Sequence, residues 1–399
     1  MNILFLLKSF DIGGLEVVTT VLANKFYAEG HHVVLWAFYE GDTSLRDRLN
    51  NNIPIIYGHG FMASSDNVTS LRKALIENSI SIVVNQWGLP LVPARTLKKA
   101  SKGLDIKVIA VYHNDPSTNG RLKGVEIAMD RTQSLSKKLL LSMKHWCFKQ
   151  ITAASMRYIY RNSDRFMVLS ASFIDGFRKF TGLKNTEKLI VQTNPITIDT
   201  PNYVPDLDKK NKEIIYVGRV DYNQKRVSRI IEVWSLLEHK HPDWKLLIVG
   251  DGPEKTNLEN LSRQLGLSSV SFEGFKNPME YYERASILVL ASEYEGFGLV
   301  IVEAMSFGVV PVVLGSYSAV FDILNDGENG FILPYRQNEG FHAQEMADII
   351  EDLMENPSKL KRMGMSALDS SIRYSINNIS EDWNGVFRHF WGGNFSNTK

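Results

Sequence analysis

The sequence has almost no cysteine: Cys147 is the single one among 399 residues. One cysteine cannot close an internal disulfide, and it cannot build a cysteine-rich zinc module. No apolar run approaches the roughly 20 residues that cross a bilayer, and the opening residues lack the basic leader and apolar core of a secretory signal. We therefore expect a cytoplasmic protein.

An excess of charge of one sign is missing as well. The sequence holds 45 lysine and arginine residues against 44 aspartate and glutamate residues, a formal net charge of +1, so nothing global indicates a nucleic-acid partner. Walker, Gly-x-Ser-x-Gly and zinc-protease patterns are absent, and no histidine, cysteine or carboxylate group shows metal-ligand spacing. We expect no metal and no cofactor.

What is present is a repeated alternation of strand and helix patterns. At 399 residues, 44% of them hydrophobic, the chain exceeds the size at which one core usually keeps growing. Apolar runs alternate with helical periodicity until the polar stretch "DTPNYVPDLDKKNK" and restart at Glu213. The pattern predicts an α/β fold with two Rossmann-like, doubly wound domains facing each other across a cleft.

The same pattern gives the domain boundaries and the strands. We predict an N-terminal domain over 1–198, a linker over 199–212 and a C-terminal domain over 213–379. A last segment, 380–396, carries Trp383, Phe387 and Phe390 at helical spacing and is expected to pack back on the first domain. The predicted strands are 2–7, 33–38, 80–84, 107–112 and 165–169, then 213–217, 245–249, 271–272, 287–290, 310–313 and 330–333.

Two features of the first domain lie where an open α/β sheet binds ligands, at the carboxyl ends of its strands. Gly13 and Gly14 separate the first strand from the first helix, so that a phosphate could approach the helix N-terminus; an ordinary tight turn is the alternative. His113 ends the strand pattern "KVIAVYHND" and could bond a sugar hydroxyl or a backbone carbonyl, although a structural histidine is equally compatible.

A cluster of cations follows the first strand of the second domain. In "YVGRVDYNQKR", Gly218 separates the strand from Arg219, and Lys225 follows six residues later. Two permanent cations at a strand's carboxyl end suit a diphosphate. Because Arg226 and Arg229 enlarge the cluster, a solvated basic loop remains the alternative.

The stretch "EYEGFGLVIVE" places two carboxylates around a glycine-rich turn. Glu303 stands among apolar residues, where a carboxylate loses hydration unless a donor satisfies it. A helix starting near Leu299 would present the amides of Phe297, Gly298 and Leu299 to a phosphate. A nucleoside diphosphate sugar fits, with its ribose diol bonded to Glu303 and its hexose to Glu295.

A basic stretch over 131–165 combines lysine and arginine residues with apolar residues. It contains eight cations and one anion, Asp164, with leucine and aromatic residues interleaved. Such a helix can lie on an anionic membrane surface. The alternative is a helix with a core-facing side and a solvated basic side.

With these residues assembled, nearly the whole chain resembles a retaining glycosyltransferase of family 4, built on the GT-B architecture. Glu295 to Glu303 is similar to the family's glutamate, seven residues, glutamate signature. "YVGRVDYNQK" resembles its diphosphate clamp, which implies that role for Arg219 and Lys225. Gly13 and Gly14 match its glycine loop.

The resemblance implies further contacts. His113 matches the histidine that touches the donor sugar, and the backbone near Phe275 and Lys276 would contact the base. Two positions depart from the family pattern. Arg226 follows Lys225 where glycine is usual, and Asp322, in "GSYSAVFDIL", stands at the position of a glutamate.

The resemblance also implies an activity. We expect transfer of a hexose or N-acetylhexosamine from a nucleotide sugar, with UDP favoured, to a glycan or glycolipid in cell-surface polysaccharide or lipopolysaccharide synthesis, at the cytoplasmic face of the inner membrane. The catalytic residues would be Glu295, His113, Arg219 and Lys225. Loops around 58–67 and 114–135 would set acceptor specificity. A UDP-sugar 2-epimerase and a non-catalytic glycan-binding partner are the alternatives.

Overall fold

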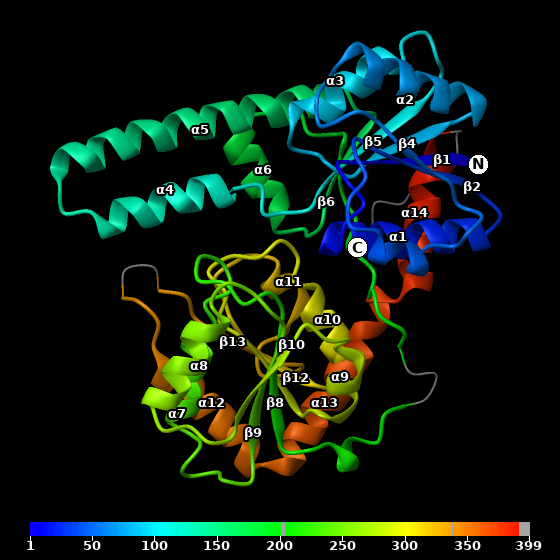
Figure 1. Cartoon of the computed structure of the whole chain (residues 1–399). Helices are drawn as coiled ribbons and strands as arrows, with labels where there is room; N and C mark the ends of the chain where they lie inside the picture. The colour runs from blue at the N-terminus through cyan, green and yellow to red at the C-terminus, as the bar shows by residue number, and fades with distance from the viewer. Residues whose placement is uncertain (118, 201–203, 337–338, 391–399) are drawn as a thin grey trace. The chain divides into compact units, whose positions relative to one another are not determined.

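The computed structural model describes residues 1–117, 119–200, 204–336 and 339–390. The chain divides into two compact units, coloured from blue to red along the sequence in Figure 1. The N-terminal unit comprises Met1–Thr197 and Ile376–Lys399, and the C-terminal unit comprises Ile198–Ser375. Each unit has its own parallel sheet, which confirms the predicted α/β fold with two Rossmann-like domains.

The sheet of the N-terminal unit has seven parallel strands in the order β3-β2-β1-β4-β5-β6-β7. They are β1 (Asn2–Leu7), β2 (His32–Ala37), β3 (Ile55–Tyr57), β4 (Ile82–Asn85), β5 (Lys107–Tyr112), β6 (Arg165–Val168) and β7 (Leu189–Val191). The winding direction reverses between β1 and β4, which pair directly. At such a switch point an open sheet leaves a crevice outside the carboxyl ends of its strands.

The helices of the N-terminal unit cover this sheet and extend beyond it. They are α1 (Gly14–Ala28), α2 (Ser65–Glu77), α3 (Leu91–Ala100), α4 (Gly120–Arg131), α5 (Leu135–Arg161), α6 (Phe173–Thr181) and α14 (Ile376–His389), with the 3-10 helix η1 (Thr43–Arg48). Helices α4 and α5 pair as a hairpin that projects away from the unit's sheet (Figure 1). None of the described helices is both long and apolar enough to cross a membrane.

The last described helix, α14, packs against the first one, α1. The ring centroids of Trp383 and Phe387 lie 6.1 and 5.4 Å from that of Phe26. Phe26 also stacks on Phe5 of β1, which connects α14 with the buried sheet. Residues 391–396 of the segment predicted to pack here lie outside the described residues.

The sheet of the C-terminal unit has six parallel strands in the order β10-β9-β8-β11-β12-β13. They are β8 (Glu213–Val217), β9 (Lys245–Val249), β10 (Val270–Gly274), β11 (Ile287–Leu290), β12 (Val310–Leu314) and β13 (Phe331–Leu333). The residues of β8, β11 and β12 are all buried, whereas those of the edge strand β10 are only partly buried. Its switch point lies between β8 and β11, where Ile214 is opposite Ile287.

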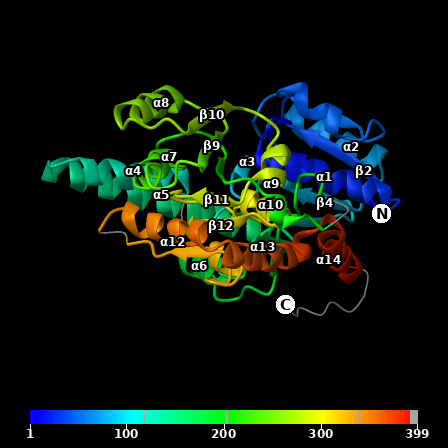
Figure 2. The same cartoon turned by 90° about the horizontal axis from the view of Figure 1, so that it is seen from below.

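The helices of the C-terminal unit are mostly short. They are α7 (Val227–Ser235), α8 (Lys255–Gln264), α9 (Met279–Arg284), α10 (Leu299–Met305), α11 (Val320–Ile323), α12 (Ala343–Glu355) and α13 (Pro357–Ser371), with the 3-10 helices η2 (Leu207–Lys209) and η3 (Ile372–Tyr374). Figure 2 shows α12 and α13 following each other along the unit. Helix α12 contacts α7, and α13 contacts α10.

The structure departs from the predicted boundaries at two places. The chain joins the C-terminal unit at Ile198, and it leaves that unit after Ser375 rather than at 379. Most of the predicted linker is therefore part of the C-terminal unit. The Leu207 side chain lies so close to Gly308 and Gly364 that an added Cβ would be 2.6 and 2.9 Å from it. Residues 201–203 of this stretch lie outside the described residues.

Candidate functional site

The candidate site of the C-terminal unit lies in the loops that follow β8 and β11, at the switch point. The ammonium of Lys225, from the first loop, lies 2.6 Å from Oε1 of Glu295, from the second. The same carboxylate oxygen accepts a hydrogen bond of 2.7 Å from the hydroxyl of Ser292. Both charged side chains are largely buried, so their attraction is weakly screened by water.

Main-chain contacts hold these two loops together. The amide of Glu293 donates to the carbonyl of Gln224 at 2.7 Å, and the side-chain amide of Gln224 donates to the carbonyl of Tyr294 at 3.2 Å. The residues before Lys225 are thereby fixed to the residues before Glu295. Neither contact depends on the two charged side chains, so the loops position the ion pair.

Glu293 forms a second ion cluster, about as buried as that pair. Its carboxylate accepts hydrogen bonds from the Tyr335 hydroxyl at 2.5 Å and from Arg229 at 2.9 Å. Burial alone would raise the pKa of Glu293, but Tyr335 and Arg229 lower it overall. Arg229 also donates to the carbonyl of Ala291 at 3.0 Å, so α7 is fastened to the end of β11. Glu293 could not be singled out from the sequence, because spacing along the chain does not show that it pairs with Arg229.

Arg219 is the most exposed member of the site. Its guanidinium makes two contacts with Asp221, Nε at 3.0 Å and Nη2 at 2.9 Å from Oδ2. The Arg219 side chain is 68% exposed and that of Asp221 only 6%. Asp221 also accepts from the amide of Gln224 at 2.7 Å. The aspartate therefore belongs to the loop structure, while the arginine can reach a ligand.

Arg226, the departure from the family pattern, adopts a left-handed backbone conformation with φ of 50°. Glycine, which the family resemblance implies at this position, accepts this conformation without a steric penalty. The guanidinium compensates by lying 4.2 Å from the ring centroid of Tyr222 and 3.8 Å from the carboxylate of Glu293. The loop thus keeps a glycine-like shape with a side chain present.

Gly218 and Gly250 are required by close packing between neighbouring loops. A Cβ on Gly250 would lie 1.8 Å from the carbonyl oxygen of Gly218, and one on Gly218 would lie 3.0 Å from the Tyr216 hydroxyl. The amide of Gly218 donates to the carbonyl of Val249 at 3.0 Å. These glycines bring the loop after β8 against the loop after β9.

The two glutamates of the "EYEGFGLVIVE" stretch have different surroundings. Glu303, on α10, is buried and accepts a hydrogen bond of 3.3 Å from the Tyr282 hydroxyl. Tyr282, on α9, was not singled out from the sequence, because a tyrosine one turn inside a helix gives no pattern that points to it. Glu303 therefore has a donor inside the protein, and a ribose would be an additional partner.

The turn before α10 has the form expected for close approach of a ligand. Gly298 has φ of 92°, which favours glycine. Phe297 is buried, and its ring lies 5.6 Å from that of Tyr374. Among the described residues, none accepts a hydrogen bond from the backbone amides of Phe297, Gly298 or Leu299.

Phe275 and Lys276 follow β10 at the same edge of the sheet. The Phe275 side chain is exposed, and Lys276 lies 3.0 Å from the carboxylate of Glu273. Hydrogen bonds from Ser271, Tyr281 and Lys276 hold the pKa of Glu273 at about 2. No described side chain joins these two residues to Lys225 or Glu295.

The remaining predicted site residues belong to the N-terminal unit and lie at its own switch point. Nε2 of His113 is 2.7 Å from Oε1 of Gln86, the residue after β4, and desolvation lowers the histidine pKa to about 4. With that pKa the ring is neutral near pH 7 and donates to the amide oxygen. His113 is therefore part of a side-chain pair that the sequence did not reveal.

Gly13 caps α1, and its lack of a side chain has a local cause. A Cβ there would be 2.4 Å from Oε2 of Glu16, whose side chain folds back over the first turn of the helix. Burial raises the pKa of Glu16 to about 7, while its own backbone amide and Lys8 oppose that change. Gly14 is exposed beside it.

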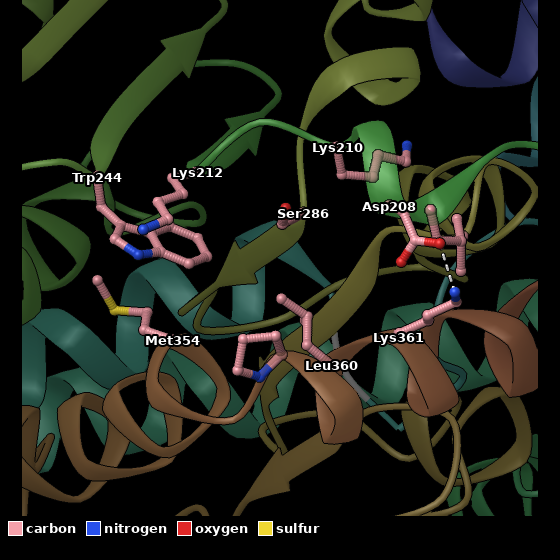
Figure 3. A pocket seen from close by; sticks show the side chains of 11 residues that line it. Asp208, Lys210, Lys212, Trp244, Ser286, Met354, Leu360 and Lys361 are labelled. Carbon is pink, nitrogen blue, oxygen red and sulfur yellow. Dashed lines mark hydrogen bonds and ion pairs between the residues drawn. The ribbon is translucent and has the colours of Figure 1, made fainter.

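A cavity of about 210 Å³ lies elsewhere in the C-terminal unit (Figure 3). Its lining includes Lys212, Trp244, Ser286 and Gly308, which come shortly before β8, β9, β11 and β12. It is therefore at the amino edge of the parallel sheet, opposite the loops of Glu295. Figure 3 also shows Lys361 in contact with Asp208.

A group of potential metal ligands that spacing did not predict occurs among the described residues. His241, Glu351 and Glu355 have ligand atoms within 4.8 Å of one another. Glu351 already accepts from Lys240 at 3.0 Å and lies 3.2 Å from Nε2 of His241. The ammonium of Lys240 already neutralises the Glu351 carboxylate that a metal would need as a ligand. The three residues are also remote in sequence from the loops described above.

Comparison with known families settles what this arrangement belongs to. Residues 12–200 match the family described as Glycosyltransferase Family 4, and residues 202–369 match the family described as Glycosyl transferases group 1. The chain belongs to glycosyltransferase family 4. The two matches meet close to the point where the chain passes between the units, so each unit matches one of the two families.

The share of each relative that this family 4 chain covers differs from one relative to the next. An uncharacterized glycosyltransferase of Haemophilus influenzae is 36% identical over 203 residues, 50% of this chain and 55% of that protein. The chain thus spans about half the length of that relative. An α-1,4-N-acetyl-D-galactosaminyltransferase of Campylobacter jejuni, named for a diphosphoundecaprenol-linked glycan, is 23% identical over 388 residues, 96% of this chain and 97% of that enzyme.

Solved structures show the fold. Anabaena HepE in complex with UDP and glucose has a TM-score of 0.72 and 19% identity, covering 98% of this chain and all of that one (100%). Staphylococcus aureus TarM, in a complex that includes UDP, has a TM-score of 0.70 and 15% identity over 97% of this chain and 99% of that one. The family 4 chain has the GT-B fold, as predicted.

Proposed function

We propose that the protein is a retaining glycosyltransferase that moves a hexose or N-acetylhexosamine from a UDP-sugar to a glycan or glycolipid, in the synthesis of a cell-surface polysaccharide or lipopolysaccharide. One observation carries the proposal: Lys225, Glu295 and Arg219 gather at the switch point of the C-terminal sheet, in a chain of family 4. Names of relatives also include amylovoran biosynthesis.

The chemistry follows from the charges. Departure of a diphosphate develops negative charge, which the exposed guanidinium of Arg219 and the ammonium of Lys225 would stabilise without a metal. The free amides of 297–299 would add hydrogen bonds to the same phosphates. Because Lys225 is already paired with Glu295, the diphosphate would share the ammonium with that carboxylate.

Glu295 has a position suited to the sugar. Its Oε1 accepts from Lys225 and Ser292, whereas the one contact of Oε2 with the described residues is long, 3.5 Å from the amide nitrogen of Gln224. That oxygen could accept a sugar hydroxyl or face positive charge developing at the anomeric carbon. The resemblance to retaining enzymes implies a same-face attack, in which the leaving phosphate takes the proton of the acceptor hydroxyl.

The alternatives differ in what they require. A UDP-sugar 2-epimerase would need a base for proton abstraction and no acceptor. His113 is neutral near pH 7 because burial lowers its pKa to about 4, but its Nε2 faces Gln86, which favours a positioning role. A non-catalytic glycan-binding partner would not need the ion pair of Lys225 with Glu295.

We also propose that the α4/α5 hairpin attaches the protein to the cytoplasmic face of an anionic membrane. Six large apolar side chains of α5 are 60% exposed or more: Leu135, Leu139, Leu140, Met143, Trp146 and Ile151. Their spacing places them within one half of the helix circumference. Contacts of His145 with Glu126 and of Ser142 with Met129 show that α4 covers the other half. Lys137 and Lys144 border the apolar face, which suits anionic headgroups.

The test of the proposed activity begins with binding. Calorimetric titration with UDP and GDP should show UDP bound more tightly, and hydrolysis of a UDP-sugar panel should identify the donor. Arg219→Ala should lower turnover about 100-fold or more without changing the circular dichroism spectrum. Arg263→Ala, at an exposed arginine of α8, is the matched control. Absence of binding by both nucleotides would reject the proposal.

A further inference from the structure

The N-terminal unit has an unexplained cluster at its switch point, made of Lys8 and three aromatic rings. The ammonium of Lys8, directly after β1, lies 5.5 Å from the ring centroid of Trp87, 5.7 Å from that of Phe61 and 5.9 Å from that of Tyr39. These distances are within the range of cation–π attraction. We call these four residues the Lys8 aromatic cluster.

The fold, rather than chance, assembles this cluster. Tyr39 follows β2, Phe61 follows β3 and Trp87 follows β4, so all members come from the carboxyl ends of parallel strands. The amide of Tyr39 donates to the carbonyl of Lys8 at 3.3 Å. Tyr39 and Phe61 pack on the hydrophobic core while remaining partly exposed. The rings are therefore a supported surface and not loose side chains.

The charge of Lys8 is not neutralised by a contacting carboxylate. Among the described residues, none forms an ion pair with it. Glu16 is the acidic group that senses Lys8 electrostatically, and burial raises the pKa of that carboxyl to about 7. A half-buried ammonium between aromatic faces keeps its N–H donors for an acceptor on a ligand.

Buried polar atoms without hydrogen-bond partners also occur at the carboxyl ends of β4 and β5. Among the described residues of the N-terminal unit, the buried side-chain nitrogen and oxygen atoms that lack a hydrogen bond are Nε2 of Gln86, Nε1 of Trp87 and the hydroxyl of Tyr112. Gln86 is 1% exposed and Tyr112 is 2% exposed. Gln86 and Trp87 directly follow β4, and Tyr112 is the last residue of β5. Since buried polar groups are normally paired, their concentration here indicates a ligand rich in acceptors.

We propose that the Lys8 aromatic cluster binds an anionic sugar, with the pyranose ring against the indole of Trp87 and a carboxylate or phosphate of that sugar bonded to Lys8. A pyranose has a face of C–H groups that packs on an aromatic ring, and its oxygens accept hydrogen bonds from indole and amide N–H groups. Neutral sugars would lack the partner for the ammonium. That this sugar is the acceptor of the transfer rests on the proposed function.

The experiment measures binding of small sugars without requiring turnover. Saturation-transfer NMR and tryptophan fluorescence titrations would compare methyl β-glucuronide, glucose 6-phosphate and methyl β-glucoside, with inorganic phosphate as a fourth probe. We expect at least one anionic sugar to bind at least tenfold more tightly than the neutral glucoside and than phosphate alone. The two anionic sugars distinguish a carboxylate ligand from a phosphate ligand.

Variants connect the binding to the cluster. Lys8→Gln should remove the preference for the anionic sugar, and Trp87→Phe should weaken all sugars while keeping the preference. Lys73→Gln, the same change at an exposed lysine of α2, should change neither. Equal binding of charged and neutral sugars by the unmodified protein, or of phosphate and sugar phosphate, would overturn the proposal without need of any variant.

The design separates this inference from the proposed function. UDP binding is measured by calorimetry on the same preparations, and Lys8→Gln should leave it unchanged. Failure of UDP to bind would reject the transferase proposal while an anionic-sugar preference would stand. Normal UDP binding with no preference among the sugars would reject the Lys8 site alone.

Discussion

Lys225 and Glu295 form an ion pair of 2.6 Å between two loops that are 70 residues apart in the sequence. Their side chains are 15% and 9% exposed, so removal of one leaves the other charged and poorly hydrated. Breaking such a pair costs roughly 3 to 5 kcal/mol, more than removing both charges together.

A double-mutant cycle should therefore show strong coupling at this site. We expect Lys225→Met and Glu295→Gln each to lower the free energy of unfolding, and the double variant to lose less than the sum of the two. The exposed pair Lys73 and Glu77, 3.8 Å apart, is the control and should couple by no more than about 0.5 kcal/mol. Additive effects at Lys225 and Glu295 would show that the pair is not energetically buried.

Glu303 should contribute to nucleotide binding more than to stability. We expect Glu303→Gln to weaken UDP binding by roughly 1.5 to 3 kcal/mol in calorimetry, because a charged acceptor for the ribose is lost. Tyr282→Phe removes the hydroxyl that Glu303 accepts from and should have a smaller effect on UDP. If Glu303→Gln binds UDP normally, the partners of this carboxylate lie inside the protein and it does not bind the nucleotide.

Arg226 tests the backbone conformation of the loop directly. Both Arg226→Gly and Arg226→Ala lose the contacts with Tyr222 and Glu293, but only alanine keeps a Cβ at φ of 50°. Urea unfolding should find the glycine variant more stable than the alanine variant by about 1 kcal/mol. The reverse order would mean that the loop relaxes out of the left-handed region.

The raised pKa of Glu16 predicts a pH effect of defined sign. Because the folded-state pKa is about 7 and the ordinary value is 4.5, the folded state binds more protons between these values, and stability falls as pH rises through that window. His113, with its pKa lowered from 6.5 to about 4, has the opposite effect. Unfolding of Glu16→Gln at pH 5 and pH 8 isolates the first contribution.

The expected result is that the unmodified protein and Glu16→Gln differ in how their stability changes with pH. From pH 5 to pH 8 the unmodified protein should lose stability relative to Glu16→Gln, on the order of 3 kcal/mol. Glu77→Gln, at an exposed glutamate, serves as the control. A relative stability that does not change with pH would mean that the carboxyl is hydrated in the folded protein.

The hairpin makes a prediction about vesicles. Neutralising Lys137, Lys138 and Lys144 should weaken flotation with anionic phosphatidylserine vesicles, because each lysine near such a surface contributes about 1 kcal/mol. Trp146→Ser should weaken binding as well, since the indole is 63% exposed. Neutralising Lys98, Lys99 and Lys102 on or after α3 is the control. If neither the variant lacking Lys137, Lys138 and Lys144 nor Trp146→Ser binds vesicles more weakly, the membrane proposal is rejected.

The strands could be predicted wherever they are central in a sheet. Those at 2–7, 107–112, 213–217, 245–249 and 287–290 agree with the structure at both ends, because strands buried on both faces are continuous apolar runs. The strands that were missed, β3 and β7, have three residues each and lie at the edges of the N-terminal sheet. So few residues give no periodic pattern.

Residues of the candidate site could be singled out from the sequence where a motif contains them, but their pairing with residues of distant segments could not. Arg219, Lys225 and Glu295 stand out in their motifs, but the pairing of Lys225 with Glu295 depends on which strands are neighbours. The Lys8 aromatic cluster was invisible for the same reason, since Tyr39, Phe61 and Trp87 belong to three separate segments. Spacing along the chain cannot show convergence that only strand order produces.

The packing of α14 on α1 affects how the protein comes to be folded. The N-terminal unit is completed by residues that leave the ribosome after the whole C-terminal unit. In the folded protein Trp383 and Phe387 cover the apolar surface around Phe26. During synthesis this surface stays uncovered while residues 198–375 are added to the chain. We therefore expect the C-terminal unit to be able to fold before the N-terminal unit is complete.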